Sequence, residues 1–167
     1  MAGKDKPKGM RKGLTRYGDD AFALFLRKSF IKGAGYGDDA LDRLVIGIAD
    51  TSSDFNPCHG NSQELIAQVR AGVLAAGGLP MAFPTISLHE SFAHPTSMYL
   101  RNLMAMDTEE MLKSLPVDAV VLVGGCDKTV PAQVMGALSA NIPFVQLVSG
   151  PMLTGSFFGE RAGACTT

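Results

Sequence analysis

The chain has few cysteines, no tryptophan and no long apolar stretch. Its three cysteines, Cys58, Cys126 and Cys165, show no regular pairing pattern, which argues against a disulfide framework. No C-x-x-C pair occurs, so a conventional zinc knuckle is not expected. No apolar run approaches the roughly 20 residues of a membrane span, and the first residues lack the apolar core of a secretory signal. We therefore expect a cytoplasmic, reducing location and no membrane partner.

A strong net charge is also missing. The formal net charge is -1, with 46% hydrophobic and 19% charged residues, so the composition is globular and no nucleic-acid partner is expected. The exception is the start of the chain, where five basic residues stand against Asp5 alone: Lys4, Lys6, Lys8, Arg11 and Lys12. Residues 1–18 are therefore predicted to form a basic, solvated, flexible tail. A phosphate-binding arm is the alternative, but no aromatic residue interleaves these charges.

Strand-like apolar runs alternate with segments of helical periodicity through the rest of the chain. Strands are expected at 44–49, 81–88, 119–123 and 143–148. Helices are expected at 19–32, from 61 or 62 to the glycines at 77 and 78, at 96–106, from 107 or 108 onward, and at 130–139. In the first helix, the apolar face is formed by Phe22, Phe25, Leu26 and Phe30. The alternation predicts an α/β fold over residues 19–167, a layered α/β/α domain with a mostly parallel sheet.

Polar clusters follow three of the predicted strands, at residues 50–59, 87–94 and 124–129. Ligands of such sheets bind beyond the carboxyl ends of the strands, so these clusters are the first indication of a functional site.

The cluster Gly124-Gly125-Cys126-Asp127-Lys128-Thr129 is the richest in chemistry. The glycines allow a tight turn and a close approach, and the neighbouring thiol and carboxylate suit a soft and a hard metal ion. A glycine turn with a buried cysteine and a surface ion pair explains the same residues equally well. A phosphate-binding loop is a further alternative, although the spacing of the Walker motif is absent.

Cys58 and Glu90 lie in the other two clusters. Cys58 could join Cys126 at a metal centre, although a lone cysteine is more often simply buried. Glu90 gains interest only if it lies beside Asp127. The three histidines lack the i, i+4 spacing of a helical zinc site, so they are interpreted as hydrogen-bonding loop residues: His59, His89 and His94.

From about residue 42 onward the sequence resembles the dihydroxy-acid and sugar-acid dehydratase family. The order and spacing of five stretches carry the resemblance, and the combination of Asn-x-Cys-His with Cys-Asp-Lys is specific. The stretches are Ser53-Asp54-x-Asn56-x-Cys58-His59, Ser87-Leu88-x-Glu90-x-Phe92, Tyr99-Leu100-Arg101-Asn102-Leu103-x-Ala105-Met106, Gly124-Gly125-Cys126-Asp127-Lys128-Thr129 and Ser149-Gly150-Pro151-Met152.

The resemblance implies an iron–sulfur, magnesium-dependent hydro-lyase. Cys58 and Cys126 would be two of three cysteine ligands of a [2Fe-2S] cluster, with [4Fe-4S] less favoured. Glu90, Asp127 and Lys128 would bind Mg²⁺, with Lys128 carbamylated after burial and the metal lower its pKa. Asp127 and Lys128 are also the candidate catalytic residues. The substrate would be a small 2,3-dihydroxy carboxylic acid, converted to a 2-oxo acid.

The resemblance also implies that the chain is incomplete. The family has a second, β-rich C-terminal domain, and its third cluster cysteine is expected downstream of residue 167, so Cys165 is not taken as a ligand. We expect the 167 residues alone to be inactive and the full-length protein to be a homodimer or homotetramer.

Several functions remain open at this level. Glu90 and the Gly-Gly pair before Cys126 resemble the sugar-acid (aldonate) members, and a dihydroxy-acid dehydratase of branched-chain amino-acid biosynthesis is the alternative. From other classes, a non-catalytic ligand-binding or interaction module would simply bury both cysteines. A thiol enzyme would use Cys126 as a nucleophile at a helix N-terminus.

Overall fold

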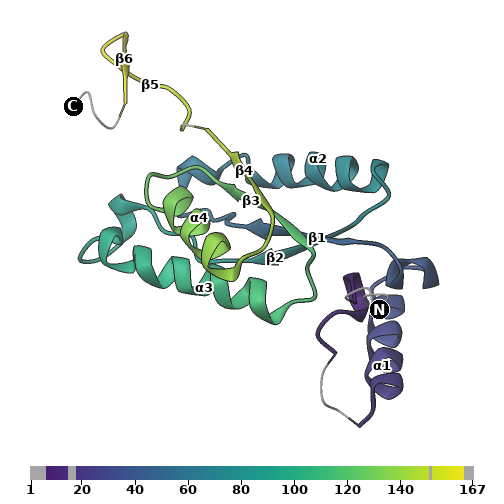
Figure 1. Ribbon diagram of the computed structural model, residues 1–167. Coiled ribbons are helices and arrows are strands. Elements are labelled where there is room, and N and C mark those ends of the chain that lie inside the picture. The colour runs from purple at the N-terminus through teal and green to yellow at the C-terminus, as the bar shows by residue number, and fades with distance from the viewer. Residues whose placement is uncertain (1–6, 15–17, 151, 164–167) are drawn as a thin grey trace.

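A four-stranded parallel sheet forms the centre of the computed structural model, which describes residues 7–14, 18–150 and 152–163. The strands lie in the order β2-β1-β3-β4, and every neighbouring pair is parallel (Figure 1). Their bounds are Val45–Asp50 (β1), Leu79–Pro84 (β2), Ala119–Gly124 (β3) and Phe144–Val148 (β4). The predicted α/β fold with a mostly parallel sheet is confirmed.

Helices cover both faces of the sheet. Figure 1 shows α2 (Ser62–Ala75) on one face, with α3 (Arg101–Ser114) and α4 (Thr129–Ala140) on the other. Because side chains alternate along a strand, β1 supplies Ile48 to the core under α2 and Val45 to the core shared with α3 and α4. Both side chains are fully buried, which explains why β1 and β3 are apolar on both faces.

One long helix replaces the two helices predicted from residue 96 onward. A short 3-10 turn, Ser97–Leu100, runs directly into α3. The predicted second start at Asp107 or Thr108 is wrong, because Asp107 accepts a hydrogen bond from the main-chain N–H of Ile86 (2.8 Å) instead of capping a helix of its own. Thr108 donates to the carbonyl of Met104 within α3 (2.9 Å), so neither of the two predicted capping residues caps a helix.

Helix α1 (Asp20–Gly33) begins where the sequence predicts, with Asp19 accepting from the N–H of Phe22 (2.8 Å). Its predicted apolar face is wrong for the phenylalanines, since Phe22, Phe25 and Phe30 are each at least 50% exposed. The buried positions are Ala23 and Ile31. The helix therefore packs against the domain through fewer residues than its apolar periodicity predicts.

The first described residues pack against the domain, in contrast to the predicted flexible tail. Gly9 and Met10 are buried, and the N–H of Gly9 donates to Asp118 (2.8 Å). Gly9 has φ +55°, and a Cβ there would lie 2.2 Å from the carbonyl oxygen of Arg43, so only glycine fits. The prediction is thus wrong for residues 9–12. Residues 1–6 and 15–17, with Lys4 and Lys6, lie outside the described residues.

Two further boundaries differ from expectation. Strand β2 ends at Pro84, so 85–88 belongs to the loop beside the site. Beyond β4 the chain forms a small antiparallel hairpin, β5 (Gly155–Phe157) and β6 (Glu160–Ala162), that the sequence does not predict. The remaining 3-10 turns are Gly9–Arg11, Asp38–Leu41, Pro57–His59 and Glu90–Phe92. Among the described helices, none combines the length and apolarity that a membrane span requires.

Candidate metal and substrate site

The three predicted polar clusters meet at the carboxyl edge of the sheet. Strands β1 and β3 are neighbours, and the chain leaves them toward helices on opposite faces, α2 after β1 and α4 after β3. In such sheets, ligands bind beyond the strand ends at the point where the connections diverge in this way. The loop after β2 brings Glu90 close to Lys128 and His89 close to the two cysteines at the same edge.

Cys58 and Cys126 lie together, as the sequence predicts. One donor atom each from Cys58, Cys126 and His89 lies within 4.8 Å of the other two. Cys126 is only 7% exposed, and Cys58 is half-buried. His89 is the residue that the sequence did not identify, since histidine spacing along the chain carried no signal. The three come from loops after three different strands, and only the fold brings them together.

Gly125 holds the two cysteine loops at close range. A Cβ on Gly125 would lie 2.6 Å from the carbonyl oxygen of Cys58 and 2.2 Å from the hydroxyl oxygen of Ser149. That hydroxyl donates to the same carbonyl at 2.7 Å. The close approach expected at the glycine pair is therefore made by the main chain of the Cys58 loop.

A buried hydrogen-bond network fixes the loops around the cysteines. Asn56 accepts from the thiol of Cys126 (3.1 Å) and donates to the hydroxyl of Ser87 and the carbonyl of Leu88 (both 3.2 Å). The Nδ1 atom of His59 lies 2.8 Å from both the carbonyl of Thr51 and the hydroxyl of Ser87. His59 is thus a hydrogen-bonding loop residue, as interpreted from the sequence.

The environment of Cys126 does not suit a free nucleophile. Burial, followed by the neighbouring Cys58, raises the pKa of the Cys126 thiol to about 12. A reactive thiol requires the opposite shift. Two adjacent thiols with a histidine match the soft donors that iron or zinc prefers, so the donor set fits a metal centre better than a thiol enzyme.

Glu90, Asp127 and Lys128 form a second cluster. The Nζ atom of Lys128 lies 3.2 Å from Asp127 Oδ2 and 3.5 Å from Glu90 Oε2. Glu90 accepts hydrogen bonds from the hydroxyl and the N–H of Ser97, the latter at 3.0 Å. These bonds lower the pKa of Glu90 to about 2, and the bond from the Ser97 side chain has the largest effect. Two carboxylates at one edge match the hard oxygen ligands of Mg²⁺.

Lys128 is an ammonium in this arrangement. Its side chain is 14% exposed, and burial by itself lowers its pKa. Asp127 and Glu90 outweigh burial, so the pKa of Lys128 is raised. The sequence-based expectation that burial lowers the pKa of Lys128, and so frees its amine for carbamylation, is therefore not met, because the two carboxylates raise this pKa. A metal ion, which would bind those carboxylates, is the remaining cause that could free the amine.

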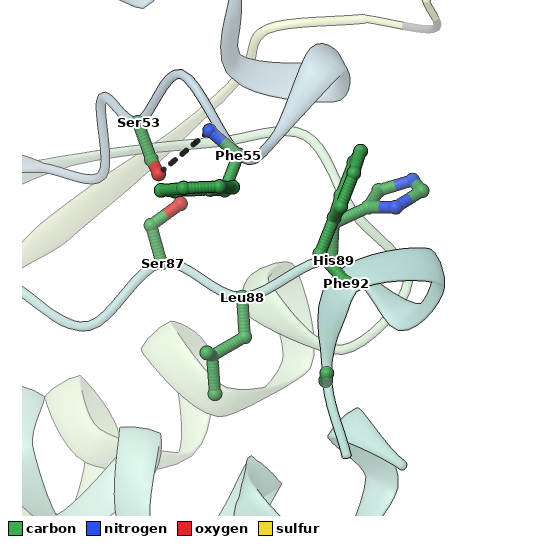
Figure 2. A pocket seen from close by; sticks show the side chains of 7 residues that line it. Ser53, Phe55, Ser87, Leu88, His89 and Phe92 are labelled. Atoms are coloured by element: carbon green, nitrogen blue, oxygen red, sulfur yellow. Dashed lines mark hydrogen bonds between the residues drawn. The ribbon is translucent and has the colours of Figure 1, made fainter. Parts of the chain in front are cut away.

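A pocket of about 320 Å³ opens beside the cysteine cluster. Figure 2 shows Phe55 on one side of it and His89 beside Phe92 on the other, with the Ser87 hydroxyl near the Phe55 ring. The rings of Phe55 and Phe92 pack edge to face, with their centroids 5.9 Å apart. Its lining residues are Ser53, Phe55, Ser87, Leu88, His89, Phe92 and Ala93. A small ligand bound there would lie against His89.

Comparison with known proteins identifies the class to which this fold and site belong. The family model for the dihydroxy-acid/6-phosphogluconate dehydratase N-terminal region matches residues 43–166. The chain therefore belongs to the dihydroxy-acid/6-phosphogluconate dehydratase family, and it corresponds to the N-terminal portion.

Relatives from two substrate branches are similar to this chain. It is 44% identical over 151 residues to the L-arabinonate dehydratase of Rhizobium leguminosarum bv. trifolii, with 90% of this chain and 26% of the relative covered. It is 41% identical over 147 residues to the D-xylonate dehydratase of Caulobacter vibrioides (88% and 25%). It is 37% identical over 145 residues to the dihydroxy-acid dehydratase of Clostridium botulinum (84% and 26%). The chain thus spans about a quarter of the length of these relatives.

Proposed function

We propose that the protein containing this chain is a hydro-lyase that converts a 2,3-dihydroxy carboxylic acid to a 2-oxo-3-deoxy acid. In this reaction the C2 proton and the C3 hydroxyl leave together as water, and the resulting enol becomes the oxo acid. Membership of the dehydratase family supports the reaction class.

The observation that carries the proposal is the meeting of two different donor sets at one edge of the sheet. The thiols of Cys58 and Cys126 form the soft set, and Glu90 and Asp127 with Lys128 form the hard set. Asp127 and Lys128 directly follow Cys126 in the chain, so the two sets are neighbours. A protein that merely buries two cysteines does not need carboxylates converging beside them.

Each set has a proposed metal. Cys58 and Cys126 would hold two positions of a [2Fe-2S] cluster, and Glu90, Asp127 and carbamylated Lys128 would hold Mg²⁺. When bound, the cluster would supply a Lewis acid for the departing hydroxyl and the magnesium would clamp the substrate carboxylate.

The chain's own residues prepare these positions. Gly125 and the Asn56 network fix the cysteine loops in place through contacts within the protein. Ser97 orients the Glu90 carboxylate by donating two hydrogen bonds to one of its oxygens. Lys128 bridges Glu90 and Asp127, and its positive charge keeps the two carboxylates close together. The site is therefore largely preorganised for ligands of two kinds.

Within this reaction class we propose a sugar acid (an aldonate) as substrate. Higher identity to the L-arabinonate and D-xylonate dehydratases than to the dihydroxy-acid dehydratase supports this choice. The discriminating measurement is kcat/KM of the complete protein for C5 aldonates and for a branched 2,3-dihydroxy acid without further hydroxyls. A preference for the branched acid would indicate a dihydroxy-acid dehydratase of branched-chain amino-acid biosynthesis instead. The reaction class would be unchanged.

The test of the metal assignment is analysis of iron and acid-labile sulfide in the complete protein, purified without oxygen. We expect about two irons and two sulfides per chain, and loss of both in Cys58→Ser and Cys126→Ser variants. Ser53→Ala, next to the same loop but without a donor in the cysteine cluster, is the matched control and should retain them. A parent protein that binds no iron after reconstitution would contradict the proposal.

A further inference from the structure

The hydroxyl oxygen of Ser87 accepts hydrogen bonds from two buried side chains. The Nδ2 atom of Asn56 donates to this oxygen and to the carbonyl of Leu88, both at 3.2 Å. A carbonyl only accepts, so the Leu88 contact fixes which end of the Asn56 amide is the donor. The Nδ1 atom of His59 lies 2.8 Å from Ser87 Oγ and 2.8 Å from the carbonyl of Thr51. The Thr51 carbonyl therefore requires a proton on Nδ1, and His59 is the second donor to Ser87.

These two bonds leave Ser87 with one remaining function, which is to donate. A serine hydroxyl has two acceptor positions and one proton, and Asn56 and His59 occupy both acceptor positions. The direction of the O–H bond is then set by the other three bonds around the oxygen. Within the described part of the chain, the Ser87 hydroxyl makes no hydrogen bond as a donor. Ser87 thus carries an oriented donor that a ligand can use.

This donor belongs to the pocket of about 320 Å³. Ser87 is one of its lining residues, and Figure 2 shows the hydroxyl oxygen beside the ring of Phe55, which forms one wall. The side chains of Asn56 and His59 are 1% and 2% exposed, so they hold the hydroxyl from the protein side and leave the pocket side open. A ligand in the pocket would meet the Ser87 proton directly.

The lining of the pocket suits an uncharged, hydroxylated carbon chain. It contains no Asp, Glu, Lys or Arg, so a carboxylate would find no opposite charge there. The rings of Phe55 and Phe92 are 70% and 62% exposed and offer apolar surface to C–H groups. An apolar wall with a small number of placed polar groups is the usual composition of a small-molecule site.

The pocket also lies next to the proposed magnesium ligands. Ser87 and Leu88 line it, and Glu90 follows in the same loop, where Lys128 Nζ lies 3.5 Å from its carboxylate. A substrate whose carboxylate end is held at Glu90 and Asp127 would extend its remaining carbons toward the pocket. A volume of about 320 Å³ is at the low end for ligand sites, which suits a short chain.

We infer that this pocket binds the part of the substrate beyond C3, and that Ser87 determines specificity there by donating a hydrogen bond to a substrate hydroxyl. The inference rests on the proposed function and names the residue that separates sugar acids from alkyl acids. An alkyl chain offers no acceptor to Ser87, so its binding would remove water from the Ser87 O–H without replacing the hydrogen bond.

The experiment compares two substrates of the complete, iron-loaded protein. One is a pentonate, and the other is 2,3-dihydroxypentanoate, which has the same carbon chain without the hydroxyls on C4 and C5. We expect the parent to have the higher kcat/KM for the pentonate. Ser87→Ala should lower this preference about three- to tenfold, the usual effect of one hydrogen bond. The change should lie mainly in KM, because the carbons beyond C3 take no part in bond breaking.

Two further variants separate recognition from support of the loop. Ser87→Thr keeps the hydroxyl and should keep the preference. Ser91→Ala, an exposed position of the same loop outside the pocket, is the matched control and should behave as the parent does. Loss of the acceptor for Asn56 and His59 would lower kcat/KM for both acids alike and leave their ratio unchanged. An unchanged ratio in Ser87→Ala would therefore overturn the inference.

Phe92→Ala provides a second test if Ser87→Ala does not fold, because the Phe92 ring is mostly exposed and its loss leaves the core intact. This substitution should raise KM for the pentonate severalfold, since one wall of the pocket is removed. The affinity for 2,3-dihydroxypropanoate, measured as a competitor, should be unchanged because that acid has no carbon beyond C3. Equal weakening of both acids, or of neither, would contradict the assignment of the pocket.

The parent protein distinguishes this inference from the proposed function. If the iron-loaded parent dehydrates neither acid, the proposed function is wrong and the inference is lost with it. If the parent dehydrates both acids but does not prefer the pentonate, or if Ser87→Ala keeps the preference, only the role of Ser87 is wrong and the reaction class stands.

Discussion

The two donor sets at the carboxyl edge of the sheet are held in different ways. Cys126 is 7% exposed and lies against the main chain of neighbouring loops, with Gly125 packed on the carbonyl of Cys58. The side chains of Glu90 and Asp127 are 47% and 80% exposed, and within the described part of the chain Lys128 is the one ion-pair partner of Asp127. The first set is built into the fold, and the second set stands on its surface.

This difference separates stability from ligand binding. Changes around the cysteines disturb buried atoms that cannot move independently, so they should lower the free energy of unfolding. Changes among the exposed carboxylates alter charge and ligation while the core stays intact, and exposed ion pairs contribute little to stability. Substitutions in the two sets should therefore differ in their effects, with the largest loss of stability beside the cysteines.

Gly125→Ala should lower the free energy of unfolding by about 1–3 kcal/mol or more, the usual cost of overpacking. The added Cβ would lie 2.6 Å from the Cys58 carbonyl, and a main-chain atom cannot rotate away as the Ser149 hydroxyl can. Urea denaturation measures the effect. Gly72→Ala is the control, because nothing lies within 4 Å in the interior of α2, and it should stabilise by about 0.5–1 kcal/mol. Equal effects of the two substitutions would contradict the proposed tight contact.

Asn56→Ala should lower the free energy of unfolding by about 1–3 kcal/mol, because it removes the hydrogen bonds to the buried Cys126 and to the partly buried Ser87 and Leu88. Thermal and urea denaturation measure the loss. Asn102→Ala, at an exposed position of α3, is the matched control and should stay within about 0.5 kcal/mol of the parent. An Asn56→Ala variant as stable as the control would show that the network does not hold the cysteine loops.

Ser97→Ala should raise the pKa of Glu90 from about 2 back toward its ordinary value of 4.5, since the Ser97 hydroxyl is the main cause of the shift. Because the folded pKa lies below the unfolded value, the Glu90 contribution to stability is present above pH 4.5 and disappears as the pH falls toward 2. Carboxyl ¹³C titration of Glu90 measures the change directly. Ser91→Ala, on the same loop, is the control and should leave the pKa of Glu90 unchanged. An unchanged pKa of Glu90 in Ser97→Ala would show that the Ser97 hydroxyl is not the main cause of the shift.

Asp127→Asn should change the free energy of unfolding by less than about 0.5 kcal/mol, because the side chain is largely solvated. In the complete protein the same substitution should weaken Mg²⁺ binding, as measured by the magnesium dependence of activity. Marked destabilisation by Asp127→Asn would break the contrast between the two donor sets.

Local patterns account for much of the molecule. Uninterrupted apolar runs predict the positions of β1, β3 and β4, and the polar clusters after the strands predict where the site lies, because the carboxyl ends of parallel strands share one edge. The same reasoning, with the family resemblance, indicates Cys58, Glu90, Cys126, Asp127 and Lys128, and the fold brings these residues to that edge.

Local patterns fail where a residue is used by a distant part of the chain. Asp107 has the sequence signal of a helix start, yet it binds the main chain of Ile86 and α3 runs through it. Phe22 and Phe30 follow helical periodicity but face solvent, while Met10, in a stretch with a tail-like composition, is buried. Periodicity reports which side chains share a face, and it does not report which face is covered.

The sequence by itself determined the alternation of strands and helices, and hence the parallel sheet and the edge at which its ligands bind, because hydrophobic periodicity and strand-end chemistry are local properties. Only the tertiary structure decided that His89 lies beside the two cysteines, that Gly125 packs on the Cys58 carbonyl, and that Lys128 lies between two carboxylates. These features depend on distances between loops far apart in the chain, and such distances are set only when the sheet aligns its strand ends.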